Sequence, residues 1–344
     1  MSKKVFVGLS GGVDSSVTAA LLIEQGYDVT GVFMKNWSQD LPGFECPWKQ
    51  DYQDAKRVAV QLGIPFKMYD FETEYREKVV DYMIAEYMAG NTPNPDIMCN
   101  QEVKFKLFLE TALSDGADMI ATGHYAKIIN CQLFMADNKD KDQTYFLYRV
   151  SEEALSRSLM PLGDFKSKDE VRAKAKDLGL VTASKKDSQG ICFVGKVGIR
   201  EFLQQYVESA EGEIVDDKGK VVGSHDGAIF YTIGQRHGLN VGGGLPYYVT
   251  GKNMKKNEVY VTTDLGDEKL WRSELKLTSI HIINPKLILN KLSIRTRYRA
   301  SLIDCELDMK SGVVKLKDEV RAVTPGQSAV IYDGERCVGG GVIA

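Results

Sequence analysis

Gly8-Leu9-Ser10-Gly11-Gly12-Val13-Asp14-Ser15-Ser16 links an apolar run at residues 5–9 to an amphipathic run at residues 17–25. This order predicts a β-strand, a glycine-rich turn and the start of an α-helix. The glycines let backbone N–H groups approach an anion closely, and the helix adds the partial positive charge of its N-terminus. The turn therefore predicts a phosphate-binding site.

The spacing of this turn separates it from two common phosphate-binding motifs. It is not G-x-x-x-x-G-K-[ST], so it supplies no loop lysine, and it is not the dinucleotide motif G-x-G-x-x-G. Residues 10–15 instead resemble the pyrophosphate loop (PP-loop), S-G-G-x-D-S, of the ATP pyrophosphatases. That resemblance implies cleavage of ATP between its α- and β-phosphates, with AMP transferred to a substrate oxygen. A turn without a ligand is the alternative.

The first two hundred residues alternate strand-like and helix-like segments. Short apolar runs at 5–9, 29–34, 65–71 and 119–122 are separated by helical patterns at 17–25, 51–62, 74–89 and 103–113. Such alternation predicts an α/β fold with a mostly parallel sheet, covered on both faces and binding ligands at the carboxyl ends of its strands. A hairpin at 127–135 and helices at 152–157 and 167–178 follow, with Ser167 and Glu170 as a capping box.

The last third of the chain has a different pattern. Short alternating segments with frequent glycine predict strands at 212–215, 221–223, 230–233, 247–250 and 258–262, and further strands at 293–298, 302–307, 313–317, 329–332 and 338–343. Strands at this spacing indicate two small, mostly β domains, the last barrel-like. We therefore predict three domains, at residues 1–198, 199–272 and 273–344.

Composition narrows the class of protein. The chain has 344 residues, a net charge of −3, and six scattered cysteines without a C-x-x-C pair, so neither a disulfide scaffold nor a protein-bound metal site is predicted. No apolar run is long enough for a membrane helix, and the first strand follows Met1 almost directly, so we expect no membrane partner and a cytoplasmic location.

One segment of the chain is strongly basic, although the net charge of the whole chain gives no indication of nucleic-acid binding. The segment 286–299 holds five basic residues and no acidic one, and Arg295, Arg297 and Arg299 alternate with other residues, so in a strand they would share one face. Such a face either contacts a nucleic acid or is simply solvated.

Two cysteine motifs carry candidate chemistry. Asn94-Pro95-Asp96-Ile97-Met98-Cys99-Asn100 predicts a loop just ahead of the helix near residue 103, where helix amides would stabilise a Cys99 thiolate. Cys99 is thus a nucleophile candidate, with a buried structural cysteine as the alternative. Cys192 lies between two glycines in residues 188–195, which permits movement; the role of Cys46 is left open.

Seven motifs in a fixed order make a wider resemblance. These are S-G-G-V-D-S-S (10–16), N-P-D-I-M-C-N (94–100), T-G-H-Y-A (122–126), K-D-Q-T-Y-F-L (141–147), S-Q-G-I-C-F-V-G (188–195), T-I-G-Q-R-H-G-L (232–239) and T-R-Y-R-A (296–300). Together they resemble the bacterial tRNA-specific 2-thiouridylase (MnmA) family, over essentially the whole chain. The implied fold is a Rossmann-like PP-loop ATP pyrophosphatase domain followed by the two β domains.

The resemblance also implies roles for residues. The nucleophile would be Cys99 and the persulfide carrier Cys192. Asp96 is close enough to Cys99 in the sequence to be a general acid or base. ATP would be bound by Gly8, Leu9, Ser10, Gly11, Gly12, Val13, Asp14, Ser15, Met34 and Gly123. The target base would meet Asn94, Pro95 and Asp96, and other parts of the tRNA would meet His124, Lys141, Asp142, Gln143, Arg297, Tyr298 and Gln327.

The implied reaction is 2-thiouridine synthesis at the wobble position of the lysine, glutamate and glutamine tRNAs. ATP, with Mg²⁺, would adenylate the C2 oxygen, because this oxygen is a very poor leaving group until it is activated. Sulfur would then come from the Cys192 persulfide, loaded by a cysteine desulfurase or a relay protein. Either its terminal sulfur attacks C2 directly, or Cys99 attacks the persulfide and releases hydrosulfide, and both routes end in a Cys99–Cys192 disulfide. The alternatives are another PP-loop enzyme, either a thiolase of a different RNA position or an amide-forming ligase, and a non-catalytic nucleotide- or RNA-binding protein.

Overall fold

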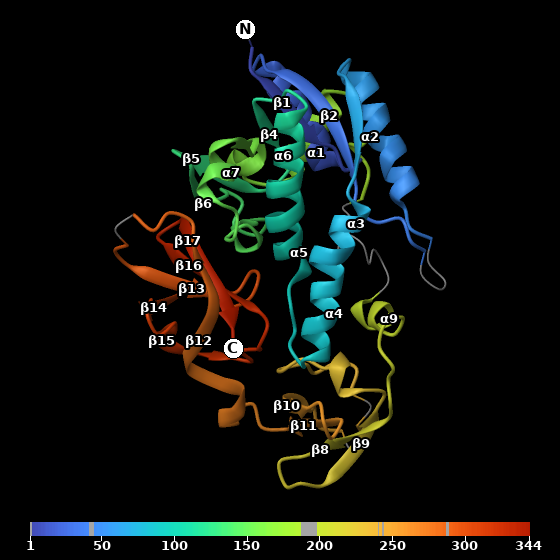
Figure 1. The fold of residues 1–344 in the computed structure, drawn as a ribbon. Helices are drawn as coiled ribbons and strands as arrows, with labels where there is room; N and C mark the ends of the chain where they lie inside the picture. Colours follow the sequence, from blue (N-terminus) through green and yellow to red (C-terminus); the bar gives the residue numbers. More distant parts are fainter. Residues whose placement is uncertain (1, 41–44, 187–197, 240, 243, 287–288) are drawn as a thin grey trace.

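The structure, a computed structural model, describes residues 2–344 except 41–44, 187–197, 240, 243 and 287–288. Three bodies of secondary structure follow one another along the chain (Figure 1). The N-terminal α/β domain lies at one end, and the central and C-terminal β domains lie side by side beyond it, with α4 running between the α/β domain and the central one. The predicted fold class is confirmed.

A parallel five-stranded sheet forms the frame of the N-terminal domain. Its order is β3-β2-β1-β4-β7, and every neighbouring pair is parallel. The order reverses between β1 and β4, which is the place where open α/β sheets bind ligands. The strands are β1 (Lys4–Gly8), β2 (Asp28–Lys35), β3 (Phe66–Asp70), β4 (Met119–Ala121) and β7 (Ser158–Leu159).

Helices cover both faces of this sheet. Val5 and Val7 of β1 pack under α1 and α2, while Phe6 faces the opposite way, toward the helices that follow β3. This alternation is the two-residue period of a strand, and burial on both sides explains why β1 is apolar throughout its length. The helices are α1 (Val13–Glu24), α2 (Trp48–Leu62), α3 (Glu72–Tyr75), α4 (Asp81–Met88), α5 (Pro95–Met98), α6 (Phe108–Ser114), α7 (Glu152–Ser156) and α8 (Lys168–Asp177).

Two helical segments differ from their predictions. A π-helix, η1 (Arg76–Val80), joins α3 to α4, and a second, η2 (Cys99–Leu107), joins α5 to α6. The second segment is helical from Pro95, eight residues before the predicted start at 103. Asn94 caps it by accepting a hydrogen bond from the Asp96 amide, and proline is well suited to the first helical position. The prediction of a loop at residues 94–100 was therefore wrong.

The central domain is a small sheet of four strands preceded by a short helix, α9 (Ile199–Leu203). Its strand order is β10-β11-β8-β9, with β11 and β8 parallel. The strand predicted at 230–233 is absent from the described structure, where Ala228–Phe230 form a 3₁₀ turn instead. The strands are β8 (Gly212–Val215), β9 (Val221–His225), β10 (Tyr248–Asn253) and β11 (Glu258–Thr262).

The C-terminal domain is a closed barrel. Six strands follow the order β12-β15-β14-β13-β16-β17, and pairing of β12 with β17 closes the ring, so the barrel has no open edge there. This confirms the barrel prediction, although the long strand β12 was not predicted. The strands are β12 (Trp271–Ile282), β13 (Leu292–Arg295), β14 (Ile303–Asp308), β15 (Val313–Arg321), β16 (Ser328–Asp333) and β17 (Arg336–Ile343).

The predicted hairpin of the first domain pairs with this barrel. Its strands, β5 (Ala126–Ile129) and β6 (Gln132–Met135), turn at Asn130 and Cys131, both with positive φ, as a two-residue turn of type I′ requires. β6 then pairs with β17. One core cluster accordingly contains residues of all three domains, among them Val103, Phe202, Ile229 and Tyr332. No helix among the described residues is long and apolar enough to cross a membrane.

Candidate functional site

The predicted phosphate loop joins β1 to α1 and is held by its own serines. Ser15 Oγ donates to Gly12 O at 3.1 Å and accepts from Ser10 N at 3.2 Å, and Ser16 Oγ also donates to Gly12 O, at 2.8 Å. Gly12 caps α1 without a side-chain hydrogen bond. The first amides of α1 are thus left for a ligand, and the helix dipole favours a negatively charged one.

Two glycines bring other segments close to this loop. Gly11 has φ +73°, and a Cβ placed there would lie 2.4 Å from Asp51 O in α2. A Cβ on Gly123, which follows β4, would lie 2.9 Å from Ser15 N. Both positions therefore need glycine, the first for its conformation as well as for space. The loop is tightly wedged between α2 and the end of β4.

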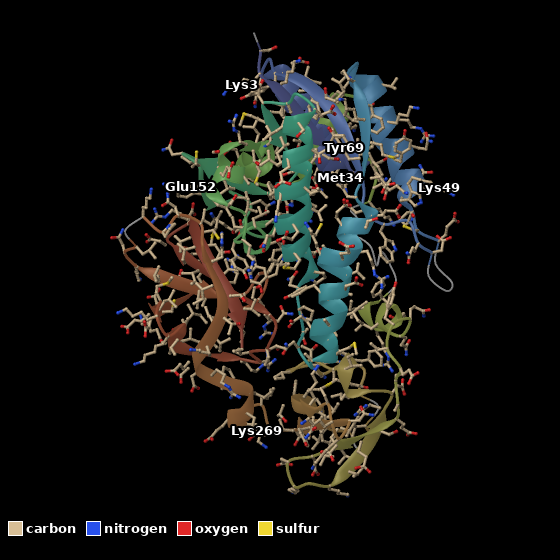
Figure 2. The ribbon with its side chains drawn as sticks, viewed as in Figure 1. Lys3, Met34, Lys49, Tyr69, Glu152 and Lys269 are labelled. Atoms are coloured by element: carbon tan, nitrogen blue, oxygen red, sulfur yellow. The ribbon has the colours of Figure 1, made fainter. Side chains whose placement is uncertain are left out.

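A cavity of about 310 Å³ opens beside the loop. It lies at the carboxyl ends of β1, β2 and β4, the edge predicted for ligands, and Figure 2 shows Met34 near this edge and Lys3 at the opposite one. Its wall includes the predicted ATP residues Gly8, Leu9, Ser10, Asp14, Ser15, Met34 and Gly123. Further lining residues are Phe33, Lys35, Asn36, Trp37, Cys46, Pro47, Trp48, Asp51, Lys104, Thr122, His124 and Gln143.

The acidic residue of the loop is neutralised by a lysine that sequence reasoning missed. Lys168 Nζ lies 2.7 Å from both carboxylate oxygens of Asp14, and Tyr125 Oη donates to one of them, also at 2.7 Å. Lys168 begins α8, directly after the N-cap Ser167. The capping pattern located this helix in the sequence, but nothing local indicates that its first side chain reaches residue 14.

Other ion pairs hold the mouth of the cavity. Lys35 is paired with Asp70 and with Glu72, and its ammonium lies 5.1 Å from the centre of the Trp48 ring. Lys185 bridges Asp51 at 2.8 Å and Asp54 at 2.7 Å on α2. The chain just before residue 187 is thereby fixed beside the helix that packs on the phosphate loop.

The helix that carries Cys99 adjoins the cavity. Cys99 is 1% exposed and does not line the cavity, whereas Lys104, five residues later in η2, does. Cys99 N donates to Pro95 O, so Cys99 lies within the helix, four residues after its first residue, and the prediction that it precedes the helix was wrong. Burial raises the pKa of Asp96, and the Lys104 charge acts in the opposite direction.

His124 connects the two regions. Its Nδ1 is 2.8 Å from Thr122 Oγ1, and its ring lies 5.6 Å from the Phe105 ring in η2. Burial lowers the pKa of His124 well below its usual range, and the positive charge of Lys104 lowers it further. The imidazole is therefore neutral at physiological pH and offers a hydrogen bond rather than a charge.

The predicted tRNA residues 141–143 have different surroundings. Asp142 is 1% exposed and accepts from Thr144 Oγ1 at 2.8 Å and from Arg295 at 3.3 Å, so its side chain holds its own loop to the barrel. Gln143 lines the cavity and accepts from Tyr125 N at 2.9 Å. Lys141 lies half-buried ahead of them.

The predicted basic strand is shorter than expected. β13 ends at Arg295, and Arg299 has φ +63°, so the three arginines do not share one face. Arg295 is mostly buried beside Asp142, while Arg297 is exposed and donates to Arg321 O at 2.6 Å. That part of the prediction was wrong, because the chain turns after Arg295 to place Tyr298 against Phe146, with ring centres 4.6 Å apart.

Gln327 contacts the segment that leads to the predicted base-binding residues. Its Nε2 donates to Thr92 O at 2.8 Å, and Thr92 N donates to Pro325 O at 2.9 Å. Thr92 Oγ1 also lies 3.4 Å from Thr232 Oγ1 of the central domain. The turn before Asn94 is thus held by both β domains.

Two further cysteines were singled out in the sequence. Cys46 lines the cavity, where burial raises its pKa, and Cys192 lies outside the described residues.

Comparisons with known proteins agree with this arrangement. Three family profiles match in series: "tRNA methyl transferase HUP domain" at residues 3–196, "tRNA methyl transferase PRC-barrel domain" at 200–263 and "Aminomethyltransferase beta-barrel domain" at 272–343.

Relatives named tRNA-specific 2-thiouridylase MnmA match 99% of this chain: that of Enterococcus faecalis is 44% identical over 95% of its own length, and those of Bacillus subtilis and Listeria monocytogenes (serotype 4a) are 46% and 47% identical over 94% of theirs. With this identity along nearly its whole length, and with a phosphate loop beside a cysteine-bearing helix, the chain belongs to the tRNA-specific 2-thiouridylase family of enzymes.

Proposed function

We propose that this enzyme converts the wobble uridine of the lysine, glutamate and glutamine tRNAs to 2-thiouridine in an ATP-dependent reaction. The observation that carries the proposal is the nucleotide-sized cavity whose wall combines the phosphate loop with Lys104, a residue of the Cys99 helix. A phosphate site and a thiol on adjoining elements are what an activation followed by a sulfur transfer requires. The names of the curated relatives agree with it.

Adenylation is the first half of the proposed reaction. The C2 oxygen of uracil attacks the α-phosphorus of ATP, the bond to the β-phosphate breaks, and pyrophosphate leaves with the bonding electrons. The N3 proton of the base passes to a carboxylate, for which we propose Asp96, because burial raises its pKa and so makes it a stronger base. The amides of α1 and the phosphate loop would hold the leaving pyrophosphate.

The residues present fit a magnesium ion that arrives with ATP. Magnesium is usually held by one or two carboxylates together with substrate phosphates, and Asp14 and Asp51 are both residues of the cavity wall. Their carboxylates pair with Lys168 and Lys185, so either of them would share its charge between a lysine and the ion. When bound, the ion would neutralise charge on the departing pyrophosphate.

Sulfur transfer is the second half. The terminal sulfur of a Cys192 persulfide attacks C2, and AMP leaves with the oxygen. The Cys99 thiolate then attacks the inner sulfur of that persulfide, which leaves the outer sulfur on the base and forms a Cys99–Cys192 disulfide. The base regains its proton from Asp96. An external thiol reductant supplies two electrons to reopen the disulfide, as the reducing cytoplasm would allow, and a cysteine desulfurase or relay protein reloads Cys192.

Recognition of tRNA would rely on local contacts, since the net charge of the chain is −3. The wobble base must leave its stack to approach the buried helix of Cys99, as bases do in other enzymes that modify them. We propose that Arg297, Tyr298, Lys141 and Gln327 contact the tRNA around it. Affinity should fall as salt rises, because each phosphate contact releases counterions.

The decisive experiment combines the enzyme with ATP, magnesium, a persulfide donor and unmodified tRNA. Nucleosides are then identified by mass spectrometry, and pyrophosphate is counted. The proposal expects 2-thiouridine at the wobble position with one pyrophosphate for each sulfur incorporated. Thiolation at another position would identify a different RNA thiolase, and pyrophosphate release without a thiolated nucleoside would point to a ligase.

A further inference from the structure

Lys104 is a positive charge in the wall of the cavity that the proposed reaction has not yet used. Among the described residues lining the cavity, Lys35 and Lys104 are the two lysines, and no arginine joins them. Lys35 is the last residue of β2 and pairs with Asp70 and Glu72, whereas Lys104 belongs to the helix that carries Cys99. The phosphate loop itself contains no lysine, so a cation for the nucleotide has to come from another element.

The π-helix determines where Lys104 points. In an α-helix, the neighbours of Cys99 on the same face would be residues three and four positions on, Glu102 and Val103. In η2 the backbone hydrogen bonds join residues five apart, as Phe108 N to Val103 O illustrates. Bonding five residues apart widens the turn, so Val103 and Lys104, four and five positions on, flank the face of Cys99 one turn later. Lys104 therefore lies nearer to that face than it would in an α-helix, and it lines the cavity although Cys99 does not. Helical turns of this π type are frequent at functional sites.

The charge of Lys104 affects the pKa values of two residues of the site, Asp96 and His124. Burial raises the pKa of Asp96 and the Lys104 charge opposes that rise, whereas for His124 burial and the Lys104 charge both lower the pKa. Lys104 lies in the helical segment that starts at the predicted base-binding residues, and it lines the nucleotide cavity together with His124. This is the region where the α-phosphate of ATP and the C2 oxygen of the base must meet if AMP is to be transferred.

We propose that Lys104 is a catalytic residue of the adenylation step, and that it donates a hydrogen bond to a non-bridging oxygen of the α-phosphate while uracil O2 attacks. The inference rests on the proposed function and deepens it. The O2–phosphorus bond forms, the bond to the β-phosphate breaks, and the N3 proton goes to Asp96. Lys104 remains protonated throughout and stabilises negative charge on the phosphoryl oxygens, which is the usual contribution of a lysine at a phosphoryl centre.

The test compares Lys104→Met with Lys106→Met. Lys106 lies in the same helix, but its side chain is 52% exposed and pairs with Glu102, so it is a matched control. Single-turnover release of pyrophosphate with saturating tRNA should fall about 10²–10³-fold in Lys104→Met, the usual loss when one donor to a transition-state oxyanion is removed. Lys106→Met should release pyrophosphate at the wild-type rate. Binding of tRNA, measured by filter retention, should stay within about threefold of wild type in both variants.

Two results would overturn the inference. Wild-type pyrophosphate release by Lys104→Met would show that the ammonium is not used, and release without subsequent thiolation would assign Lys104 to the sulfur step. If Lys104→Met does not fold by circular dichroism, Lys104→Gln, which keeps a polar group, is measured in its place and should show the same loss. Failure of the wild-type enzyme to release pyrophosphate would instead contradict the proposed function itself.

Discussion

Lys168 Nζ lies 2.7 Å from each carboxylate oxygen of Asp14, and this pair ties the first residue of α8 to the phosphate loop. The side chains are 14% and 32% exposed, so the pair is only partly shielded from solvent. Without the lysine, the carboxylate would present an uncompensated negative charge beside the site for a triphosphate. The loop thus depends on a residue more than 150 positions away in the sequence.

We expect Lys168→Gln to weaken ATP binding by about tenfold or more, since a like charge near the phosphates costs at least about 1.4 kcal/mol. Isothermal titration with ATP and magnesium measures this. Lys174→Gln is the control, because Lys174 lies at the other end of α8 and pairs with Glu24 on the surface. Equal ATP affinity of Lys168→Gln and wild type would show that Asp14 needs no counter-charge.

The two cysteines should separate the half-reactions. Cys99→Ser and Cys192→Ser should each lose 2-thiouridine formation while still releasing pyrophosphate, because adenylation needs no thiol. Nucleoside mass spectrometry and a pyrophosphate assay measure the two outcomes on the same sample. Cys305→Ser, in strand β14 of the barrel, should thiolate normally. Normal turnover by Cys99→Ser or Cys192→Ser with a persulfide donor would contradict the proposed transfer.

Gly11 and Gly63 offer a matched pair for the phosphate loop. Both have positive φ, +73° and +67°, but a Cβ on Gly11 meets the Asp51 carbonyl at 2.4 Å while one on Gly63 meets nothing within 4 Å. Gly63→Ala should therefore cost only the conformational strain, about 1 kcal/mol of unfolding free energy, and should bind ATP normally. Gly11→Ala should displace α2 from the loop and lose ATP binding. The idea fails if both variants bind ATP equally well.

Asp142 should contribute to the stability of the folded protein. It forms a buried ion pair with Arg295, with side chains 1% and 11% exposed, and removing one partner leaves the other charge unpaired inside the protein. Asp142→Asn should lower the free energy of unfolding by about 3 kcal/mol in a urea titration. Asp137→Asn, which alters an exposed pair with Lys127, should leave stability nearly unchanged. If Asp142→Asn instead changes the salt dependence of tRNA binding and leaves the free energy of unfolding near the wild-type value, Asp142 contacts the tRNA directly.

Lys252 should make stability depend on pH in the alkaline range. Its stem lies near Gly90 at the end of α4, its ammonium donates to Tyr231 O at 2.9 Å, and burial lowers its pKa to about 8. Between about pH 8 and 10 the unfolded chain holds this proton and the folded chain releases it, so stability rises with pH. The gain should be on the order of 2 kcal/mol.

The measurement compares urea unfolding at pH 7.5 and pH 10 for wild type, Lys252→Met and a surface control, Lys256→Met. Lys252→Met should lack the alkaline gain that wild type and Lys256→Met share. An identical pH dependence in all three proteins would show that Lys252 is not the group responsible.

The parts that could be predicted from the sequence are those encoded by neighbouring residues. The phosphate loop, its flanking β1 and α1, the Ser167 cap of α8 and the β5–β6 hairpin all depend on interactions within a few positions, such as the Ser167 bond to the Glu170 amide at 3.2 Å. Their types and approximate bounds were confirmed. The pattern of apolar residues also indicated a parallel sheet and a barrel. Strands buried on both faces are apolar throughout, whereas strands buried on one face alternate apolar and polar residues.

Tertiary structure alone decided which distant groups meet. Pairing of β6 with β17, the reach of Lys168 to Asp14 and the burial of Asp142 beside Arg295 depend on segments brought together by packing. Such contacts leave no local trace, since each residue would look the same in a solvated helix or loop. The sequence therefore determined which groups the chain carries and the local elements that hold them, while packing of the three domains determined which of those groups share a site.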